Sequence, residues 1–249
     1  MGQILRDIYT DTTISSMIGF KGGTCAYFFY NLPRFSVDLD FDLLTTDEQT
    51  QKIVMEKMKN ILASYGKVKD EKNKRYTLFF LLSYGDAEHN IKVEINTRSF
   101  LPDMGKHYEL KEFLGMAMLA AKRDYLFAGK LMALSERKET AARDVYDIYF
   151  FGKENWEIDR AVVESRSKKS VKEYLAQCLT IVETMKDNQM LRGLGELMDN
   201  KNKNWVKGNL KKEAIFVLKN YLNVLKWTRL VAAAETFGFC QGVAQQSIL

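Results

Sequence analysis

The sequence predicts an α+β protein, with a small mixed sheet in its first half and a mostly helical second half. Residues 38–42 and 90–96 alternate apolar and polar side chains, which is the pattern of a half-buried strand. Residues 47–65 carry apolar side chains at helical spacing instead. Both prolines in the 249 residues come before residue 103, which favours long helices in the second half.

The first 65 residues predict two helices, a strand and a third helix. Apolar side chains near helical spacing indicate a helix at residues 2–17, and a glycine turn then precedes a short aromatic helix at 24–31. A helix that begins at residue 24 would direct its N-terminal N–H groups at a bound phosphate. Pro33 ends that helix, so a strand over residues 38–43 and an amphipathic helix over 47–65 follow.

The middle of the chain predicts a hairpin. Residues 76–84 are rich in aromatic and aliphatic side chains, and residues 90–96 place three Ile and Val side chains on one face. The polar turn at 85–90 joins the two strands. An irregular connector over 102–111 follows, and the small apolar segment 114–121 is either a buried strand or the lead into the next helix.

The second half predicts a series of helices with no internal repeat. They are expected at residues 123–137, 140–151, 157–165, 170–186, 188–199 and 210–235. We therefore expect a core over residues 1–110 and a helical domain over residues 111–249 that completes a cleft with the core.

Two carboxylates at alternate positions are the first candidate site. In a strand, Asp38 and Asp40 point to one side while Leu39 and Phe41 point to the other, and Asp42 continues the acidic face. Such carboxylates repel one another unless a cation lies between them, and hard oxygen ligands favour Mg²⁺ or Mn²⁺. The alternative is an edge strand whose acids face water.

A glycine turn upstream is the second candidate. Gly22, Gly23 and Thr24 suit a tight turn whose N–H groups and hydroxyl approach a phosphate, although a plain turn is the alternative. A phosphate cradle beside two metal-binding carboxylates is suited to phosphoryl or nucleotidyl transfer. Glu94 faces away from the buried Ile and Val side chains of its strand, so it either joins Asp38 or forms an ordinary surface ion pair.

Four ordered segments resemble the AbiEii/AbiGii-type toxin nucleotidyltransferases of the DNA polymerase β-like superfamily. They are KGGT at residues 21–24 with RFSVDLDF at 34–41, IKVEINTR at 91–98, AGKLMAL at 128–134 and ARDVYDI at 142–148. The first pair resembles the signature GG[ST]…R-x-S-x-D-L-D-F, and the last two resemble K-x-x-A-L…(K/R)-D-x-Y-D-(L/I). The resemblance implies a small mixed-sheet nucleotidyltransferase core followed by a helical region.

The resemblance also implies roles for the first group of site residues. Asp38 and Asp40 would be the metal ligands, and Glu94 would be a third ligand or the base for the acceptor hydroxyl. Gly22, Gly23 and Thr24 would hold the β- and γ-phosphates. Ser36 would donate to a phosphate oxygen, with a turn hydroxyl as the equal alternative, and Arg34 would have a positional role.

Lys130 is the expected point charge on the triphosphate, although its stem lies on an apolar helical face from which it could simply reach solvent. Asp144 and Asp147 are three residues apart on the next helix, so both can face one side. One of them is expected to position Lys130, and the sequence does not separate the two.

We therefore expect a Mg²⁺- or Mn²⁺-dependent nucleotidyltransferase that moves a nucleotide from a nucleoside triphosphate to an acceptor. The favoured acceptor is tRNA, with the protein acting as the toxin of a toxin–antitoxin pair beside a cognate antitoxin. The alternatives are a small-molecule or protein hydroxyl as acceptor, or a catalytically inactive protein that binds a partner.

Charge and targeting signals add weaker expectations. The net charge is +5, and basic residues gather at 67–75, 166–172 and 201–212. These segments are either solvated surfaces or one side of a cleft that attracts RNA. No secretion signal or membrane span is apparent, so a bacterial cytoplasmic location without membrane contact is expected.

Overall fold

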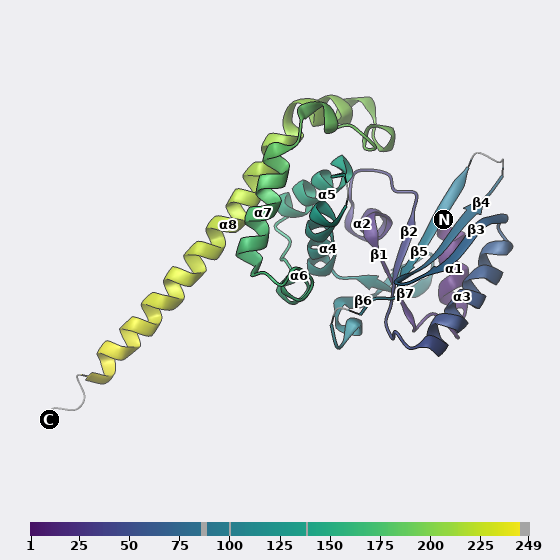
Figure 1. Ribbon diagram of the computed structural model, residues 1–249, viewed down its shortest axis with the longest axis horizontal. Coiled ribbons are helices and arrows are strands. Elements are labelled where there is room, and N and C mark those ends of the chain that lie inside the picture. The colour runs from purple at the N-terminus through teal and green to yellow at the C-terminus, as the bar shows by residue number, and fades with distance from the viewer. Residues whose placement is uncertain (86–88, 100, 138, 245–249) are drawn as a thin grey trace.

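The computed structural model describes residues 1–85, 89–99, 101–137 and 139–244, with side chains up to residue 225. A sheet with its covering helices forms one end of the molecule and a helical region forms the other (Figure 1). The predicted α+β class, with a mixed sheet followed by helices, is confirmed.

The sheet has seven strands in the order β3-β4-β5-β2-β1-β7-β6. The strands are β1 (Ile18–Lys21), β2 (Leu39–Leu43), β3 (Lys67–Lys74), β4 (Thr77–Ser83), β5 (Asn90–Asn96), β6 (Tyr108–Phe113) and β7 (Met116–Ala121). β2 pairs parallel with β5, β1 pairs parallel with β7, and the other pairings are antiparallel. The expected hairpin of residues 76–96 is therefore present as β4 and β5.

One face of the sheet is buried under helix α3 (Glu48–Ala63), while helix α1 (Gly2–Thr10) packs against α3 and β7. Leu39, Val93 and Phe80 lie side by side on neighbouring strands and are fully buried. Glu71, paired with Phe80 on the next strand, forms an ion pair of 2.7 Å with Lys59 of α3. The buried row therefore faces α3.

The helical region packs over the other end of the sheet. Helix α2 (Gly22–Tyr30) contacts β1, β2 and α4. The remaining helices are α4 (Arg123–Glu136), α5 (Ala142–Lys153), α6 (Arg160–Ser167), α7 (Val171–Thr184) and α8 (Asn200–Ala244). α7 and α5 pack against α8. Within the described residues, no helix has the length and hydropathy to span a membrane.

Several elements differ from the expected ones. The first helix ends at Thr10 rather than near residue 17, because the Asp11 carboxylate accepts the N–H of Thr13 and offers the backbone an alternative to the helix. Strand β3 was not expected, since its side chains are almost all charged or polar. The segment expected as a helix at 188–199 forms only short 3₁₀ turns.

The expected connector at 102–111 contains a 3₁₀ turn and the start of β6, and the segment 114–121 is the strand β7. The expected domain boundary at residue 110 thus falls inside β6. The sheet continues to Ala121, and the first helix of the helical region begins at Arg123.

Candidate active site

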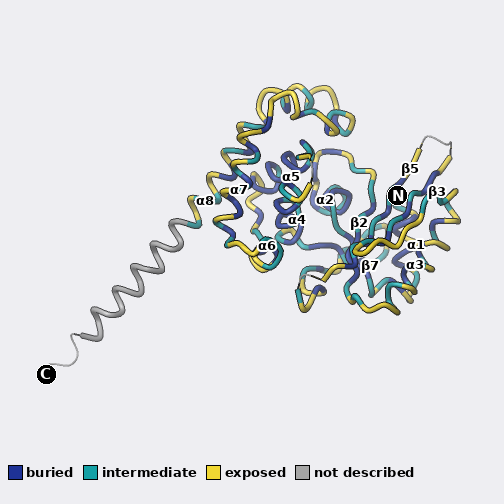
Figure 2. Tube along the Cα trace, in the orientation of Figure 1, coloured by how far each residue is buried: buried dark blue, intermediate teal, exposed yellow. Residues whose placement is uncertain are grey.

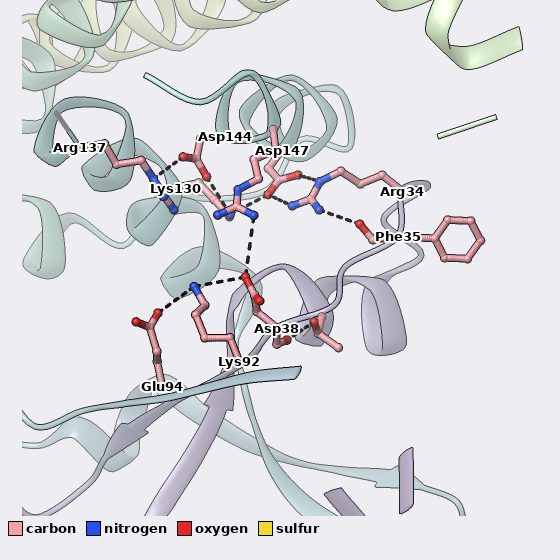
Figure 3. Close-up of polar contacts among 11 residues, drawn as sticks. Arg34, Phe35, Asp38, Lys92, Glu94, Lys130, Arg137, Asp144 and Asp147 are labelled. Carbon is pink, nitrogen blue, oxygen red and sulfur yellow. Dashed lines mark hydrogen bonds and ion pairs between the residues drawn. The ribbon is translucent and has the colours of Figure 1, made fainter. Parts of the chain in front are cut away.

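Asp40 and Glu94 are direct neighbours on the parallel strands β2 and β5. Paired residues point to the same side of a sheet, so both carboxylates lie on the face opposite α3. Asp38 immediately precedes β2, and its carboxylate reaches the same region (Figure 3). The two alternations in the sequence therefore place all three acids on one face.

Lys92, a residue that the sequence interpretation did not select, lies between two of these acids. Its ammonium nitrogen is 3.3 Å from Asp38 Oδ2 and 3.1 Å from Glu94 Oε2 (Figure 3). Burial acts to lower the pKa of Lys92, but the charges of Asp38 and Glu94 outweigh it and raise that pKa. Lys92 is therefore a resident cation on the acidic face.

Asp40 has a different environment. Its carboxylate makes no hydrogen bond or ion pair within the described residues. Burial, with a contribution from the charge of Asp38, raises its pKa above the usual value. A Cβ atom on Gly22 would collide with the Asp40 carboxylate, so glycine allows the turn to approach this acid closely. Asp40 therefore lies ready to accept a cation.

Asp42 lies on the same face of β2 as Asp40, as the alternation predicts, but it is covered there rather than open. Its side chain is fully buried and accepts hydrogen bonds from Lys21, Asn96, Tyr108 and Tyr125 at 2.5–2.6 Å. Burial opposes ionisation, but Lys21 and the two phenols hold the pKa of Asp42 below its usual value. Asp42 is thus a structural anion.

The glycine turn begins α2 at Gly22, two residues earlier than expected, and Gly22 has a φ of 80°. The Thr24 hydroxyl is buried and donates to the Asp38 carbonyl oxygen, so it holds the segment before β2 rather than pointing at open solvent. A Cβ on Gly23 would lie 3.0 Å from Ser36 Oγ and 2.8 Å from Arg34 Nη2. Ser36 and Arg34 therefore lie directly beside the turn.

A buried ion-pair network joins the loop before β2 to helices α4 and α5. The Lys130 ammonium lies 3.0 Å from Asp144 Oδ1 and 2.8 Å from Asp147 Oδ2. Arg34 donates two hydrogen bonds of 2.6 Å to Asp147. Arg137 Nε lies 2.7 Å from Asp144 Oδ2 as an ion pair (Figure 3). Both aspartates therefore position Lys130, and each also holds an arginine.

The network keeps its members charged. Burial acts to raise the pKa of Asp147, but Arg34 and Lys130 hold that pKa below its usual value. Burial likewise acts to lower the pKa of Lys130, and Asp147 and Asp144 outweigh it. Three cations face two carboxylates here, so the cluster keeps one unit of positive charge.

A cavity of about 220 Å³ opens between this network and Asp40. It is lined by Lys21, Gly22, Asp40, Tyr125, Leu126, Gly129, Lys130, Ala133, Arg137 and Arg166. Four of these side chains are cationic, which suits a polyanion beside the one carboxylate. A larger hollow of about 990 Å³ lies around Met1, Val37 and Tyr84, and no Lys or Arg lines it. Phosphate groups therefore fit the smaller cavity.

Oxygen donors for a divalent cation are present, although they are not assembled. Among the residues that the structure describes, no group of three or more His, Cys, Asp or Glu side chains is arranged around a metal position. Among the described residues, Asp40 nevertheless lacks a hydrogen-bond or ion-pair partner, and Lys92 already supplies positive charge to Asp38 and Glu94. These carboxylate oxygens carry negative charge that is not fully compensated, so they fit Mg²⁺ or Mn²⁺. A bound cation would displace Lys92 from Asp38.

Sequence reasoning missed five cations around the site: Lys21, Lys92, Arg137, Arg143 and Arg166, of which Arg143 lies 3.8 Å from Asp38 Oδ2. Lys92 could have been found, because it shares a strand face with Glu94. Lys21 directly precedes the glycine turn. The contributions of Arg137 and Arg166 depend on how α4 and α6 pack, which no local pattern reveals.

Comparison with known proteins also indicates a nucleotidyltransferase. The family model described as "Nucleotidyl transferase AbiEii toxin, Type IV TA system" matches residues 3–207, which confirms the resemblance in the sequence motifs. No curated protein matches the chain.

Solved structures share the fold. JHP933 from Helicobacter pylori is 19% identical, with a TM-score of 0.58 over 94% of this chain and 95% of that one. MenT4, a nucleotidyltransferase toxin from Mycobacterium tuberculosis, is 17% identical, with a TM-score of 0.51 over 86% of this chain and 80% of that one.

Proposed function

Because the chain belongs to the AbiEii family of nucleotidyl transferase toxins, we propose that it transfers a nucleotide from a nucleoside triphosphate to an RNA hydroxyl in a Mg²⁺- or Mn²⁺-dependent reaction. Nucleotidyl transfer and a toxin role are properties of the family as a whole. The metal, the triphosphate site and the acceptor are our proposals for this chain.

One observation carries the proposal: the unpartnered carboxylate of Asp40 borders a cavity with four cationic side chains. A triphosphate carries several negative charges and binds a divalent cation, so it needs carboxylates and cations next to each other. Lys130 is 14% exposed and held between two aspartates, so its ammonium is a fixed point charge at the cavity wall.

We assign the carboxylates by their positions. Asp38 and Asp40 would hold the divalent cation, which would offset charge on the phosphates and on the leaving pyrophosphate. Gly22 and Gly23 would present their N–H groups to the β- and γ-phosphates at the start of α2. Ser36, beside Gly23, would donate its hydroxyl to a phosphate oxygen, and Thr24 would hold Asp38 in place.

Glu94 would act on the acceptor side, as a third ligand or as the base. The acceptor oxygen attacks the α-phosphorus, the bond from that phosphorus to the bridging oxygen breaks, and pyrophosphate leaves. The acceptor proton passes to Glu94 or to water. Asp144 and Asp147 are fully buried, so we assign them to positioning Lys130 and Arg34 rather than to contact with substrate.

We propose tRNA as the acceptor and an antitoxin as the protein partner, with action in the bacterial cytoplasm. The net charge of +5 supports a polyanionic acceptor. The toxin–antitoxin family supports the existence of an antitoxin.

A transfer assay tests the proposal. Purified protein, Mg²⁺, each labelled nucleoside triphosphate in turn, and total RNA should yield labelled RNA, with tRNA carrying the label. Asp40→Asn should abolish transfer while the metal-free variant melts at the wild-type temperature or above, because one of two neighbouring carboxylates has lost its charge.

Mg²⁺ should raise the melting temperature of the wild type and have little effect on Asp40→Asn. Label that appears only on protein or on small hydroxyl compounds would reject the RNA acceptor. A large loss of stability in metal-free Asp40→Asn would show that Asp40 is structural.

A further inference from the structure

The open face of the sheet continues beyond Glu94 to the edge at β3. Glu94 pairs with Phe79 of β4, and Phe79 pairs with Lys72 of β3, so these side chains point to the same side as Asp40. Phe79 is half-buried, while β3 is exposed along most of its length (Figure 2). Phe79 is one strand from Glu94, about 5 Å.

Cations and aromatic rings alternate at this edge. The Lys74 ammonium lies 4.4 Å from the centroid of the Phe79 ring. The guanidinium groups of Arg75 and Arg98 lie 5.0 Å and 4.2 Å from the Tyr76 ring centroid, and Tyr76 is 38% exposed. We call these five residues the edge surface.

Two of its cations have no acidic partner. Lys74 and Arg75 form no ion pair with a carboxylate in the described part of the chain, whereas nearby Lys72 is neutralised by Asp70 at 2.6 Å. Cation–π contacts orient these groups without cancelling their charge. The positive charge of Lys74 and Arg75 therefore remains available to an anionic ligand.

The edge surface lies on the opposite side of the carboxylates from the cavity proposed for the triphosphate. That cavity is bordered by Lys21 of β1 and by α4, whereas the edge surface lies beyond β5. Two substrates can therefore approach Asp40 and Glu94 from opposite sides. Positive charge combined with exposed rings is the pattern of proteins that bind single-stranded nucleic acid, in which phosphates contact cations and bases stack on rings.

We propose that the edge surface binds the single-stranded end of the RNA acceptor, so that its terminal hydroxyl reaches Glu94 across Phe79. The inference rests on the proposed function and adds the place and the form of the acceptor. Lys74 and Arg75 contact phosphates, and Phe79 and Tyr76 stack on bases.

Binding of a labelled single-stranded RNA oligonucleotide tests the surface without any transfer. The double variant Lys74→Ala/Arg75→Ala should lower the affinity roughly 10-fold, and the slope of log K against log salt should become shallower by about 1.4, or about 0.7 for each lost phosphate contact. Phe79→Ala should lower the affinity roughly 10-fold and leave the slope unchanged, because stacking releases no counterions.

The matched control is Lys207→Ala/Lys212→Ala, which removes two exposed cations from the basic segment on α8. It should bind RNA as the wild type does. All variants should keep the wild-type melting temperature and nucleoside triphosphate affinity, because none of the five substituted side chains lines the cavity beside Asp40.

The results test RNA binding by the edge surface separately from the proposed nucleotidyl transfer. RNA affinity that is unchanged in the edge variants, or lost only in the α8 control, would contradict the proposal that the edge surface binds RNA. Transfer to RNA with an unchanged KM for RNA in the edge variants would also contradict RNA binding by the edge surface, while the proposed nucleotidyl transfer would remain supported. RNA binding that depends on Lys74, Arg75 and Phe79 without any nucleotide transfer would support the surface and reject the function.

Discussion

At the scale of single residues, the site separates acids that are already neutralised from acids that are not. Asp42, Asp144 and Asp147 are fully buried, and each lies in a hydrogen bond or ion pair with at least two cationic or phenolic groups. Within the described residues Asp40 has no such partner, while Asp38 shares Lys92 with Glu94 and lies 3.8 Å from the Arg143 guanidinium. Only this second group has capacity left for a further cation, which is why the chemistry is assigned to it.

Lys130 is not a lysine that simply reaches solvent from an apolar helical face. Its position between Asp144 and Asp147 predicts two effects of Lys130→Met. The free energy of unfolding should fall by about 2 kcal/mol, less than the ~3–5 kcal/mol for removing the whole compensation of a buried charge, because Arg34 and Arg137 remain. Nucleoside triphosphate affinity should fall roughly 10-fold, since a fixed charge leaves the cavity.

Chemical denaturation and nucleotide titration measure the two effects separately. Lys130→Arg should restore stability more than affinity, because its wider planar group does not reproduce a point charge. Lys207→Met, an exposed lysine on α8, is the control and should change neither quantity. Wild-type nucleotide affinity in Lys130→Met would exclude Lys130 from the triphosphate site.

At the scale of elements, the loop between α2 and β2 depends on helix α5. Arg34 and Asp147 are 113 positions apart, and their side chains are almost fully buried, so this ion pair anchors the loop that carries Ser36 and Asp38. Arg34 also donates to the carbonyl oxygen of Phe35 at 3.0 Å. α5 therefore stabilises the shape of a loop that it does not adjoin in sequence.

Arg34→Met should destabilise the protein by an amount that depends on pH. The pKa of Asp147 is below its usual value of 3.8 in the folded protein, so the stability from its ionised form is present above pH 3.8 and is lost as pH falls through the lowered pKa. The variant should be less stable by about 3 kcal/mol at about pH 6, and the difference should shrink towards about pH 2.

Urea denaturation of both proteins across this range gives the comparison. Glu48→Gln, which removes an exposed carboxylate on α3, serves as a control for general acid effects. A difference between wild type and Arg34→Met that is independent of pH would mean that lost packing, not the ion pair, causes the destabilisation.

Local patterns in the sequence predict part of this arrangement for a clear reason. Strand periodicity places Asp40 and Glu94 on one face, and each alternation is readable within a few residues. The Arg34–Asp147 contact depends on how α5 packs over the loop, and no local pattern encodes it. β3 was missed because an edge strand with polar side chains on both faces lacks the alternation that identifies strands.

At the scale of the molecule, the cavity proposed for the triphosphate lies between the two regions. The sheet side contributes Lys21, Gly22 and Asp40, while α4 and α6 contribute Lys130, Arg137 and Arg166. Neither region forms the cavity alone. A ligand that contacts both walls must therefore stabilise the regions against separation, in addition to its local contacts.

Hydrogen exchange should detect that coupling. Binding of a Mg²⁺–nucleoside triphosphate should slow amide exchange at residues 18–24 and in α4 and α6 together, because one ligand bridges both walls. The protection should increase with ligand concentration along a single binding curve for all three segments. Residues 210–225 of α8, which do not line the cavity, provide the internal control and should exchange at an unchanged rate.

The variant Lys130→Met sharpens this prediction, because it alters only the helical wall. At a ligand concentration that saturates the wild type, protection should weaken in the sheet segment and in α4 by the same factor, since occupancy of a shared cavity sets both. Protection confined to residues 18–24, with α4 and α6 unaffected in the wild type, would show that the triphosphate binds the sheet alone. In that case the four cations would not form one site, and the positive cavity could not be the reason for nucleotide binding.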